Sequence, residues 1–343
     1  MTAALDATYS VGRNLSGVGV YSRELALQLA LAHPESLFLH CFRPHKWLRG
    51  ARLRRPANAS LRFLLETRPV RGADLFHGLN QRMPSWRAAR TVCTFHDLFV
   101  LTADYSTPDF KARFAAQARE AAERSDLVVC VSQHTAGMVE ELLGVEPGRI
   151  RVTPHGVRFP ENQAPGHREK VVLHVGAIQK RKNLVRLVEA FEAGCGEDWR
   201  LVLAGSDGFG ADEVKARIEV SLAKNRIEMT GWVDDATVLD WYRRAGVFAF
   251  PSLDEGFGIP VLEAMAQGLP VVSSNRSSLP EVCGDAALMV DALDTESLAS
   301  ALHRVTHEEA LRNELRAKGL NRAREFTWAK TASLTWAVYD ELF

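Results

Sequence analysis

Short apolar segments alternate with longer amphipathic segments along the chain, and the alternation occurs twice. In the first half, apolar runs of strand length predict strands at 36–42, 61–65, 74–78, 91–97, 127–132 and 150–156. Segments with apolar residues every three or four positions predict helices at 17–32, 109–124 and 133–143. This order of strands and helices is typical of an α/β domain, a parallel sheet covered by helices on both faces.

The second half repeats the pattern. Strands are predicted at 171–178, 200–206, 227–233, 247–252, 269–274 and 286–291. Helices are predicted at 183–193, 211–223, 235–245 and 260–267, followed by a helical tail from about 294. Segment 157–168 has two prolines, one glycine and few apolar residues, which indicates an interdomain linker. We therefore expect two Rossmann-like, doubly wound domains, residues 1–165 and 166–325, with a ligand cleft between them.

Length and charge narrow the class of protein. At 343 residues the chain is long enough for two hydrophobic cores. Its 42 basic and 42 acidic residues give no net charge, so nothing global indicates a nucleic-acid partner. The five cysteines are scattered, which predicts buried thiols in a reducing compartment. Without a leader-like N-terminus or an 18-residue apolar run, we expect a cytoplasmic protein with no spanning helix.

The segment DEGFGIPVLE, residues 254–263, follows a predicted strand and opens a predicted helix. It places Glu255 in the loop and Glu263 in the first helical turn, while Gly256 and Gly258 allow backbone amides to approach a ligand. Free amides at a helix start favour phosphate, and carboxylates accept hydrogen bonds from sugar hydroxyls, so a nucleotide sugar fits. Two other interpretations remain open. Glu255 could be a solvated loop residue and Glu263 an acid that interacts favourably with the helix dipole, or the two could form the carboxylate pair of a glycosidase.

A basic loop follows the first strand of the second half. Lys180, Arg181 and Lys182 cluster between a strand and a helix, where they could neutralise a departing diphosphate. A solvated basic loop is the competing interpretation. No DxD pair ends a strand at the predicted cleft, and no His/Cys cluster has metal spacing. We therefore expect no metal site, no cofactor and a metal-independent reaction.

Two candidates lie in the first half. Gly17 and Gly19 open a predicted helix and form either a phosphate-binding loop or an ordinary helix start. His96 and Asp97 end a predicted strand at the carboxyl edge, where a histidine is either structural or directed to the cleft.

The chain resembles the retaining GT-B glycosyltransferases of family four, often called group 1. The resemblance covers nearly the whole chain and is strongest from VGAIQKRKN to AALMVD, including the E-x7-E element with its F-G-x-P interior, RKN, GWV and SLPEV. It implies a GT-B fold in which the terminal helix, 326–343, crosses back onto the first domain. Many relatives carry arginine where this chain has Ala177, so the phosphate role falls to Arg181 and Lys182.

The resemblance also implies a set of site residues. Glu263 would hold the ribose, Glu255 the donor sugar, and Arg181 with Lys182 the diphosphate. The donor-binding set is Gly17, Gly19, Gly205, Trp232, Val233, Gly256, Phe257, Gly258, Ile259 and Glu263. The catalytic set is His96, Arg181, Lys182 and Glu255. Trp232 and Val233 would lie near the base, and His96 beside the reacting sugar.

The implied activity is hexosyl transfer with retention. The HDL and SLPEV segments are most similar to mannosyltransferases that use GDP-mannose, and the acceptor would be a saccharide or lipid-linked saccharide. UDP-glucose or another donor, a GT-B nucleotide-sugar epimerase and a non-catalytic sugar-binding protein remain open. Residues 43–72 carry nine Lys/Arg and one acid among apolar residues, which predicts either contact with an anionic membrane or a solvated basic loop.

Overall fold

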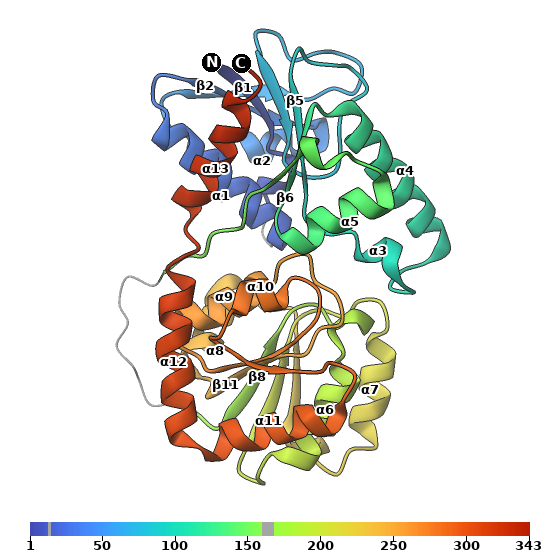
Figure 1. The fold of residues 1–343 in the computed structure, drawn as a ribbon, viewed down its shortest axis with the longest axis vertical. Coiled ribbons are helices and arrows are strands. Elements are labelled where there is room, and N and C mark those ends of the chain that lie inside the picture. The colour runs from blue at the N-terminus through green and yellow to red at the C-terminus, as the bar shows by residue number, and fades with distance from the viewer. Residues whose placement is uncertain (13–14, 160–167) are drawn as a thin grey trace. The chain divides into compact units, whose positions relative to one another are not determined.

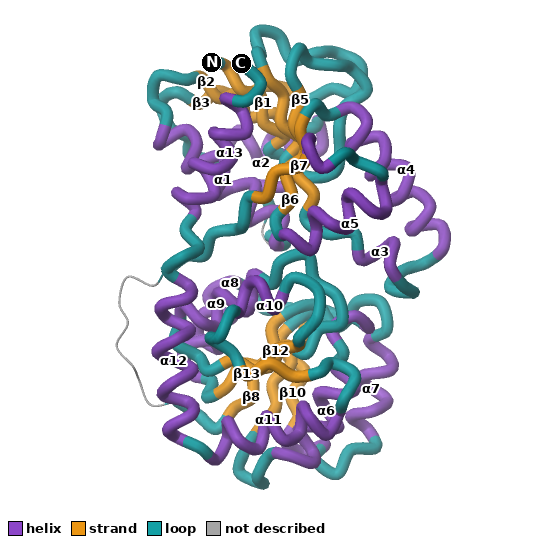
Figure 2. Tube along the Cα trace, viewed as in Figure 1, coloured by secondary structure: helices purple, strands orange, loops and turns teal. Residues whose placement is uncertain are grey.

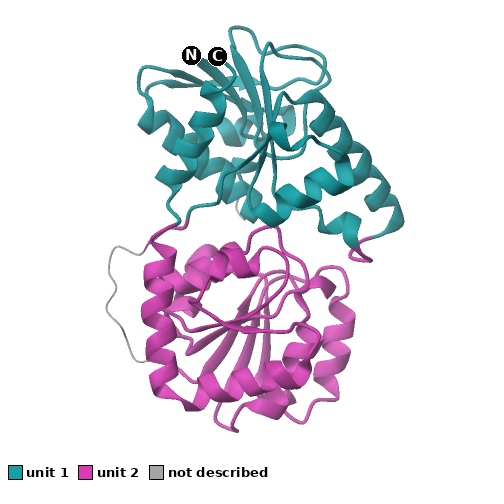
Figure 3. Ribbon diagram, viewed as in Figure 1, with its two compact units in different colours: residues 1–102, 107–156, 326–343 teal, residues 103–106, 157–325 magenta. Residues whose placement is uncertain are grey.

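The computed structural model describes residues 1–12, 15–159 and 168–343. The described residues form two compact units (Figure 3). Unit 1 comprises Met1–Thr102, Thr107–Gly156 and Phe326–Phe343, and unit 2 comprises Ala103–Ser106 and Val157–Glu325. Residues 160–167 of the predicted linker lie outside the described residues.

The sheet of unit 1, whose strands are drawn in orange in Figure 2, has seven parallel strands in the order β3-β2-β1-β4-β5-β6-β7. The strands are β1 (Thr2–Asp6), β2 (Leu37–Phe42), β3 (Ala59–Phe63), β4 (Leu75–Gly78), β5 (Thr91–Phe95), β6 (Leu127–Cys130) and β7 (Ile150–Val152). The strand order reverses between β1 and β4, which is the position where doubly wound sheets open a ligand crevice.

Helices cover both faces of this sheet, so successive strand residues are buried on opposite sides. The helices are α1 (Gly17–Ala32), α2 (Trp47–Ala51), α3 (Phe99–Thr102), α4 (Pro108–Arg124), α5 (Gln133–Leu143) and α13 (Trp328–Asp340). Leu5 packs in the core under α1 and α13, whereas its neighbour Ala4 packs in the core under α4 and α5. The terminal helix α13 lies beside α1 (Figure 1), where the rings of His33 and Trp336 stack 3.5 Å apart.

The sheet of unit 2 has six parallel strands in the order β10-β9-β8-β11-β12-β13. The strands are β8 (Val171–Val175), β9 (Arg200–Ala204), β10 (Ile227–Gly231), β11 (Val247–Phe250), β12 (Val271–Ser274) and β13 (Leu288–Val290). The helices are α6 (Leu184–Gly194), α7 (Ala211–Glu219), α8 (Asp235–Arg244), α9 (Ile259–Ala266), α10 (Leu279–Cys283), α11 (Thr295–His307) and α12 (Glu309–Ala323). This is the strand order of a dinucleotide-binding fold, with its reversal between β8 and β11.

The predicted elements are confirmed, with ends shifted by a few residues. The sequence missed β1, although it is an interior strand of its sheet, because its five residues precede the first recognisable strand–helix alternation. It also missed the helices α2, α3 and α10, each of four or five residues, which are too short to show a helical period. The five cysteines are buried free thiols, as predicted. Among the described residues, no helix combines the length and apolar character needed to cross a membrane.

Candidate functional site

The candidate site of unit 2 lies where its strand order reverses. Loops that follow neighbouring parallel strands meet at the carboxyl edge of the sheet. The loop after β8 carries the basic triplet, and the loop after β11 carries Glu255. The reversal therefore brings together two segments that are more than seventy positions apart in the sequence.

The basic loop has a fixed conformation. Lys180–Lys182 form a single 3-10 turn, and Asn183 then adopts a left-handed backbone conformation with φ of 60°. The Asn183 side-chain amide donates to the carbonyls of Pro251 and Ala292, at 3.1 and 2.6 Å. Asparagine tolerates the left-handed region better than most residues, and here its amide also attaches the loop to its neighbours.

Arg181 and Lys182 both contact one carboxylate. Lys182 Nζ lies 2.6 Å and Arg181 Nη1 lies 2.8 Å from Oε1 of Glu255. The side chains of Lys182, Arg181 and Glu255 are largely buried, at 6%, 13% and 8% exposure respectively. Burial alone raises the pKa of Glu255, but the charges of Arg181 and Lys182 outweigh burial and lower it to about 2. Lys180 is different, since it is half-exposed and faces Glu213 at 3.8 Å.

The loop backbone holds Glu255 in place. Its N–H donates to Ser277 Oγ at 3.0 Å, and its carbonyl accepts from Ser278 Oγ at 2.9 Å. Both serines follow β12, the next strand in the sheet, and Ser277 has a positive φ of 52°. The sequence did not indicate these serines, because the SLPEV segment was recognised only as a family motif.

His174, on β8, lies beneath the basic loop. Its Nδ1–H donates to the carbonyl of Ala249 at 3.0 Å, and its ring stacks on Phe250. Lys182 Nζ also lies over the Phe250 ring, 4.4 Å from its centre. Burial, with the charge of Lys182, lowers the pKa of His174 to about 3, so the imidazole is neutral beside the cationic loop. His174 lies one residue before the end of β8, and this position in a predicted strand could have identified it as a site residue from the sequence.

Glu263 has a different environment. The helix α9 begins at Ile259, one residue earlier than predicted, so Glu263 lies beyond the first turn rather than within it. Its Oε2 accepts a hydrogen bond from the hydroxyl of Tyr242 at 3.1 Å. Burial raises the pKa of Glu263 to about 7; the charge of Asp235 adds to this, whereas the Tyr242 hydrogen bond and the charge of Arg158 oppose it. Sequence reasoning missed Tyr242, which reaches Glu263 from α8.

The other predicted donor residues of unit 2 surround the same edge. A Cβ on Gly205 would lie 2.0 Å from the carbonyl oxygen of Gly176, so glycine here permits the loops after β8 and β9 to touch. Gly258 precedes α9 with φ of 103°, which favours glycine. Gly256 and Phe257 are buried, Val233 and Ile259 are half-buried, and Trp232 is 52% exposed after β10.

The predicted residues of unit 1 lie at the carboxyl edge of its own sheet. Gly17 starts α1, and the N–H of Gly19 donates to the capping hydroxyl of Ser16 at 3.4 Å. A Cβ on Gly19 would lie 2.8 Å from the carbonyl oxygen of Tyr9, which gives this glycine a packing role. Gly17, Gly19 and His96 belong to unit 1, whereas the other predicted residues belong to unit 2.

His96 follows β5 and is buried. Its Nε2–H donates to the carbonyl of Leu79 at 2.9 Å, which assigns the proton to Nε2. Burial lowers the pKa of His96 to about 4, so the ring is neutral near pH 7. The rings of Tyr21 and His155 lie 4.7 and 5.3 Å away and fix its orientation. Sequence reasoning did not identify Tyr21 or His155.

Comparisons with known proteins match both units. A model of the glycosyl transferases group 1 family matches residues 158–322, and a model of Glycosyltransferase Family 4 matches residues 15–159. O-antigen chain mannosyltransferase B of Escherichia coli is 30% identical over 284 residues, which cover 78% of this chain and 74% of that protein. The chain belongs to the group 1, family four glycosyltransferases.

Other relatives of this group 1 glycosyltransferase are longer. The serotype-specific mannosyltransferase WbdA of Escherichia coli is 29% identical over 266 residues, and the match spans 71% of this chain but 32% of WbdA.

Among solved structures, sucrose-phosphate synthase from Thermosynechococcus elongatus superposes with a TM-score of 0.80 at 21% identity, over 100% of this chain and 99% of that one. WaaG, a glycosyltransferase involved in lipopolysaccharide biosynthesis, superposes with a TM-score of 0.66 at 16% identity, over 98% of each chain. These similarities establish the GT-B fold.

The site of this glycosyltransferase has a clear division of charge. At one end, two buried cations contact one ionised carboxylate, and at the other, a carboxyl group with a raised pKa receives a hydroxyl hydrogen bond. The first environment suits an anion such as a diphosphate, and the second suits neutral hydroxyl groups. Within the described ranges, no group of three or more His, Cys, Asp and Glu residues could hold a metal ion.

Proposed function

We propose that this protein is a retaining hexosyltransferase that moves mannose from GDP-mannose to a saccharide or lipid-linked saccharide during glycan synthesis. The observation that carries the proposal is the largely buried cluster of Arg181, Lys182 and Glu255 at the strand-order reversal, with Glu263 on the helix α9 that follows. The similarity to an O-antigen chain mannosyltransferase supports mannose as the sugar.

Arg181 and Lys182 would stabilise the departing diphosphate in this proposal. Two cations held in a poorly solvated site interact strongly with charge that develops as the bond to phosphate breaks. The pair would supply the charge neutralisation that a divalent metal provides in other enzymes, so the proposed reaction is metal-independent. Glu255 fixes both cations, and together with the amides of Phe257 and Gly258 it would hold the donor sugar.

Glu263 and Tyr242 would bind the ribose. A carboxylate accepts hydrogen bonds from two vicinal hydroxyls, and the Tyr242 hydroxyl already fixes one of its oxygens. His96, with Nε2–H committed to Leu79, would meet the sugar as a neutral ring through Nδ1. It would thus act as a hydrogen-bond acceptor and not as a cation.

A front-face reaction accounts for retention without a second carboxylate nucleophile. The bond between the anomeric carbon and the phosphate oxygen breaks, and the acceptor oxygen forms its bond on the same face. The acceptor's proton passes to the departing phosphate oxygen. The anomeric configuration of the product, measured by NMR, tests this step, and an inverted product would exclude it.

The donor assignment is tested by thermal shift. Purified protein is incubated with GDP, UDP, ADP or dTDP and their sugar conjugates, with and without EDTA, as wild type, Glu263→Ala and the surface control Glu314→Ala. We expect GDP-mannose to raise the melting temperature of the wild type and of the control, with or without EDTA, and not that of Glu263→Ala. Selective stabilisation by a uridine conjugate would instead identify UDP-glucose or a related donor.

The same incubations test two further functions. Failure of every nucleotide to stabilise the wild type would favour a non-catalytic sugar-binding protein. Conversion of a nucleotide sugar to its epimer without an acceptor would favour a GT-B epimerase. The buried cation pair argues for transfer, because a binding protein does not need groups that stabilise a departing diphosphate.

We also propose that residues 43–72 contact an anionic membrane at its cytoplasmic surface. Not all of this segment is free to do so, since Arg43 is buried and pairs with Glu66. Leu48 on α2 is 77% exposed, and beside it the rings of Trp47 and Phe63 stack 3.7 Å apart. An exposed apolar side chain among arginines fits the boundary between headgroups and acyl chains.

Liposome co-sedimentation tests the membrane contact. We expect binding to vesicles with anionic lipid, weaker binding of Leu48→Asp, and binding of the control Leu222→Asp equal to that of wild type. Leu222 is 94% exposed in unit 2, so the two variants add the same charge to exposed leucines. Equal sedimentation with neutral and anionic vesicles would exclude the proposal.

A further inference from the structure

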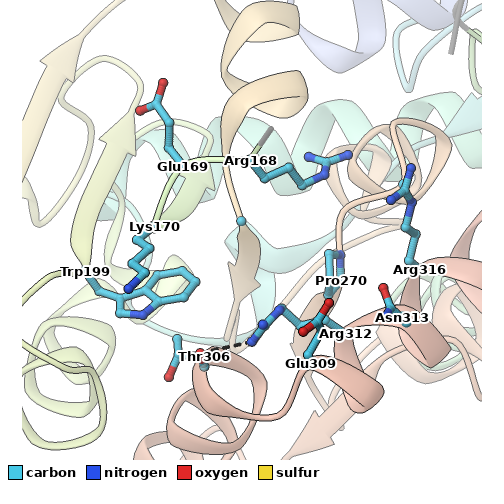
Figure 4. Close-up of a pocket in the computed structure, with 12 residues that line it drawn as sticks. Arg168, Glu169, Lys170, Trp199, Pro270, Thr306, Glu309, Arg312, Asn313 and Arg316 are labelled. Atoms are coloured by element: carbon cyan, nitrogen blue, oxygen red, sulfur yellow. Dashed lines mark hydrogen bonds between the residues drawn. The ribbon is translucent and has the colours of Figure 1, made fainter. Parts of the chain in front are cut away.

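Unit 2 contains a polar pocket at the amino ends of its strands, on the opposite edge of the sheet from Glu255. The pocket has a volume of about 240 Å³. It is lined by residues that precede four strands and by residues of α11 and α12 (Figure 4). Because parallel strands place their two ends at opposite edges, this pocket is separate from the proposed donor site.

Cations predominate in the pocket. Four basic residues line it, and two acidic residues accompany them: Arg168, Lys170, Arg312, Arg316, Glu169 and Glu309. The carboxylate of Glu169 is already engaged by Arg200 and Arg244, at 3.1 and 2.7 Å. Figure 4 shows the Glu169 carboxylate directed away from the arginines of the pocket. Glu169 is therefore not available to balance their charge.

The arginines differ in how their guanidinium groups are satisfied. Arg168 Nη1 donates to the carbonyls of Tyr242, Arg243 and Ala245 at the end of α8. Arg312 likewise donates to two carbonyls at the end of α11. In contrast, Arg316 forms no hydrogen bond or ion pair with any residue in the described part of the chain. It is half-buried, so its donors are only partly solvated.

Arg168 and Arg316 approach each other at Gly268. This glycine follows α9 in a left-handed conformation, with φ of 68°. Arg316 Nε and Arg168 Nη2 lie 3.3 and 3.7 Å from the position that a Cβ on Gly268 would occupy. Burial and the charge of Arg316 lower the pKa of Arg168 to about 10, so the two guanidinium groups repel each other unless an anion lies between them. Figure 4 shows the two groups on the same side of the pocket.

We propose that this pocket binds a phosphate group, held between Arg316 and Arg168. Arginine presents paired N–H donors that match the oxygens of a phosphate, and Arg316 commits none of these donors to a residue that the structure describes. A dianion would remove the repulsion between the two guanidinium groups. The site has no role in the proposed sugar transfer, so it constitutes a second ligand site of the protein.

Binding can be followed by the indole signals of the protein labelled with ¹⁵N-tryptophan. Trp199 lines the pocket, whereas Trp232 follows β10 at the other edge of the sheet and reports on the donor site. Each signal is assigned from the spectrum of a Trp→Phe variant. Inorganic phosphate is titrated at constant ionic strength, with sodium chloride as the balance, because salt alone screens surface charge. We expect a saturable shift of the Trp199 signal.

Two arginine variants decide the assignment. Arg316→Gln removes the uncommitted guanidinium, and Arg324→Gln removes a charge from the end of the same helix, outside the pocket. We expect phosphate to bind Arg316→Gln about tenfold more weakly, the scale of one charge-assisted hydrogen bond, and Arg324→Gln as it binds wild type. The proposal fails if Trp199 does not shift, if only Trp232 shifts, or if Arg316→Gln binds phosphate like wild type.

Discussion

Glu255 and Glu263 are eight positions apart in one segment, yet the fold gives them opposite properties. Glu255 lies in a loop between two buried cations, and its pKa is about 2. Glu263 lies on the following helix against a tyrosine hydroxyl, and its pKa is about 7. Burial acts to raise the pKa of both carboxyl groups, so burial alone does not separate them.

The difference shows that the partners of a buried acid determine its role. Two cations more than offset the desolvation of Glu255, so it remains ionised and holds Arg181 and Lys182 in position. The neutral hydroxyl of Tyr242 offsets less of the desolvation of Glu263, so Glu263 takes up a proton near neutral pH. One segment thus provides a permanent charge and a titratable group.

The largest expected effect comes from removal of the Glu255 charge. In Glu255→Gln, Arg181 and Lys182 would remain buried without their anion, which destabilises a protein by about 3–5 kcal/mol. Urea unfolding at pH 7 measures the change in the free energy of unfolding. The control is Glu213→Gln, whose carboxylate faces exposed Lys180 and contributes about 0–1 kcal/mol. Equal losses in the two variants would mean that the Glu255 cluster does not behave as a buried network.

The two glutamates should change the free energy of unfolding in opposite directions as pH rises. The folded pKa of Glu255 lies below its usual value, so its contribution is present above about pH 4.5 and declines as pH falls toward 2. The folded pKa of Glu263 is raised, so its contribution is present below about pH 4.5 and declines as pH rises through 7. A shift from 4.5 to about 2 corresponds to about 3 kcal/mol for Glu255.

The measurement is the free energy of unfolding of wild type relative to each Glu→Gln variant between about pH 3 and 8, a range that includes the transitions expected for both glutamates. Relative to Glu263→Gln, wild type should become less stable between about pH 4.5 and 7. Relative to Glu255→Gln, it should become more stable from pH 3 to 4.5. Parallel curves for the two variants would contradict the assigned pKa directions. His96, with a pKa of about 4, is not expected to contribute a transition near 6.5.

The smallest effect is expected from Tyr242→Phe, which removes only the hydroxyl that contacts Glu263. Loss of this hydrogen bond should raise the pKa of Glu263 further and weaken donor binding by about 0.5–1.5 kcal/mol. Initial-rate kinetics should show a higher KM for the donor and little change in kcat.

A matched control for this variant is Tyr339→Phe in unit 1. Its hydroxyl lies 2.6 Å from His77 Nδ1, so the variant also removes a buried tyrosine hydrogen bond. We expect a loss of stability without a change in the donor KM. The same KM change in both variants would mean that the effect of Tyr242 is general and not specific to Glu263.

Local patterns were sufficient for most of the elements and for the positions of the chemical groups. The double alternation predicted two parallel sheets, and the positions of Glu255 and the basic triplet placed them in loops after strands. The strand β1 was missed because its five residues precede the first recognisable strand–helix alternation, and only its pairing with β2 and β4 in the sheet identifies it. The helix α9 starts one residue earlier than expected, since such ends depend on local backbone geometry.

By itself, the sequence determined the fold class, the family and the segments that carry charge, because these depend on periodicity and on residues that are neighbours along the chain. The tertiary structure decided which charges meet. Arg181 and Lys182 reach Glu255 only because the strand order places distant loops at one edge. Tyr242 on α8 reaches Glu263 on α9 only once the helices around β11 are packed. Solvent exclusion at that edge then sets each pKa, and burial is a property of the packed protein and not of any one segment.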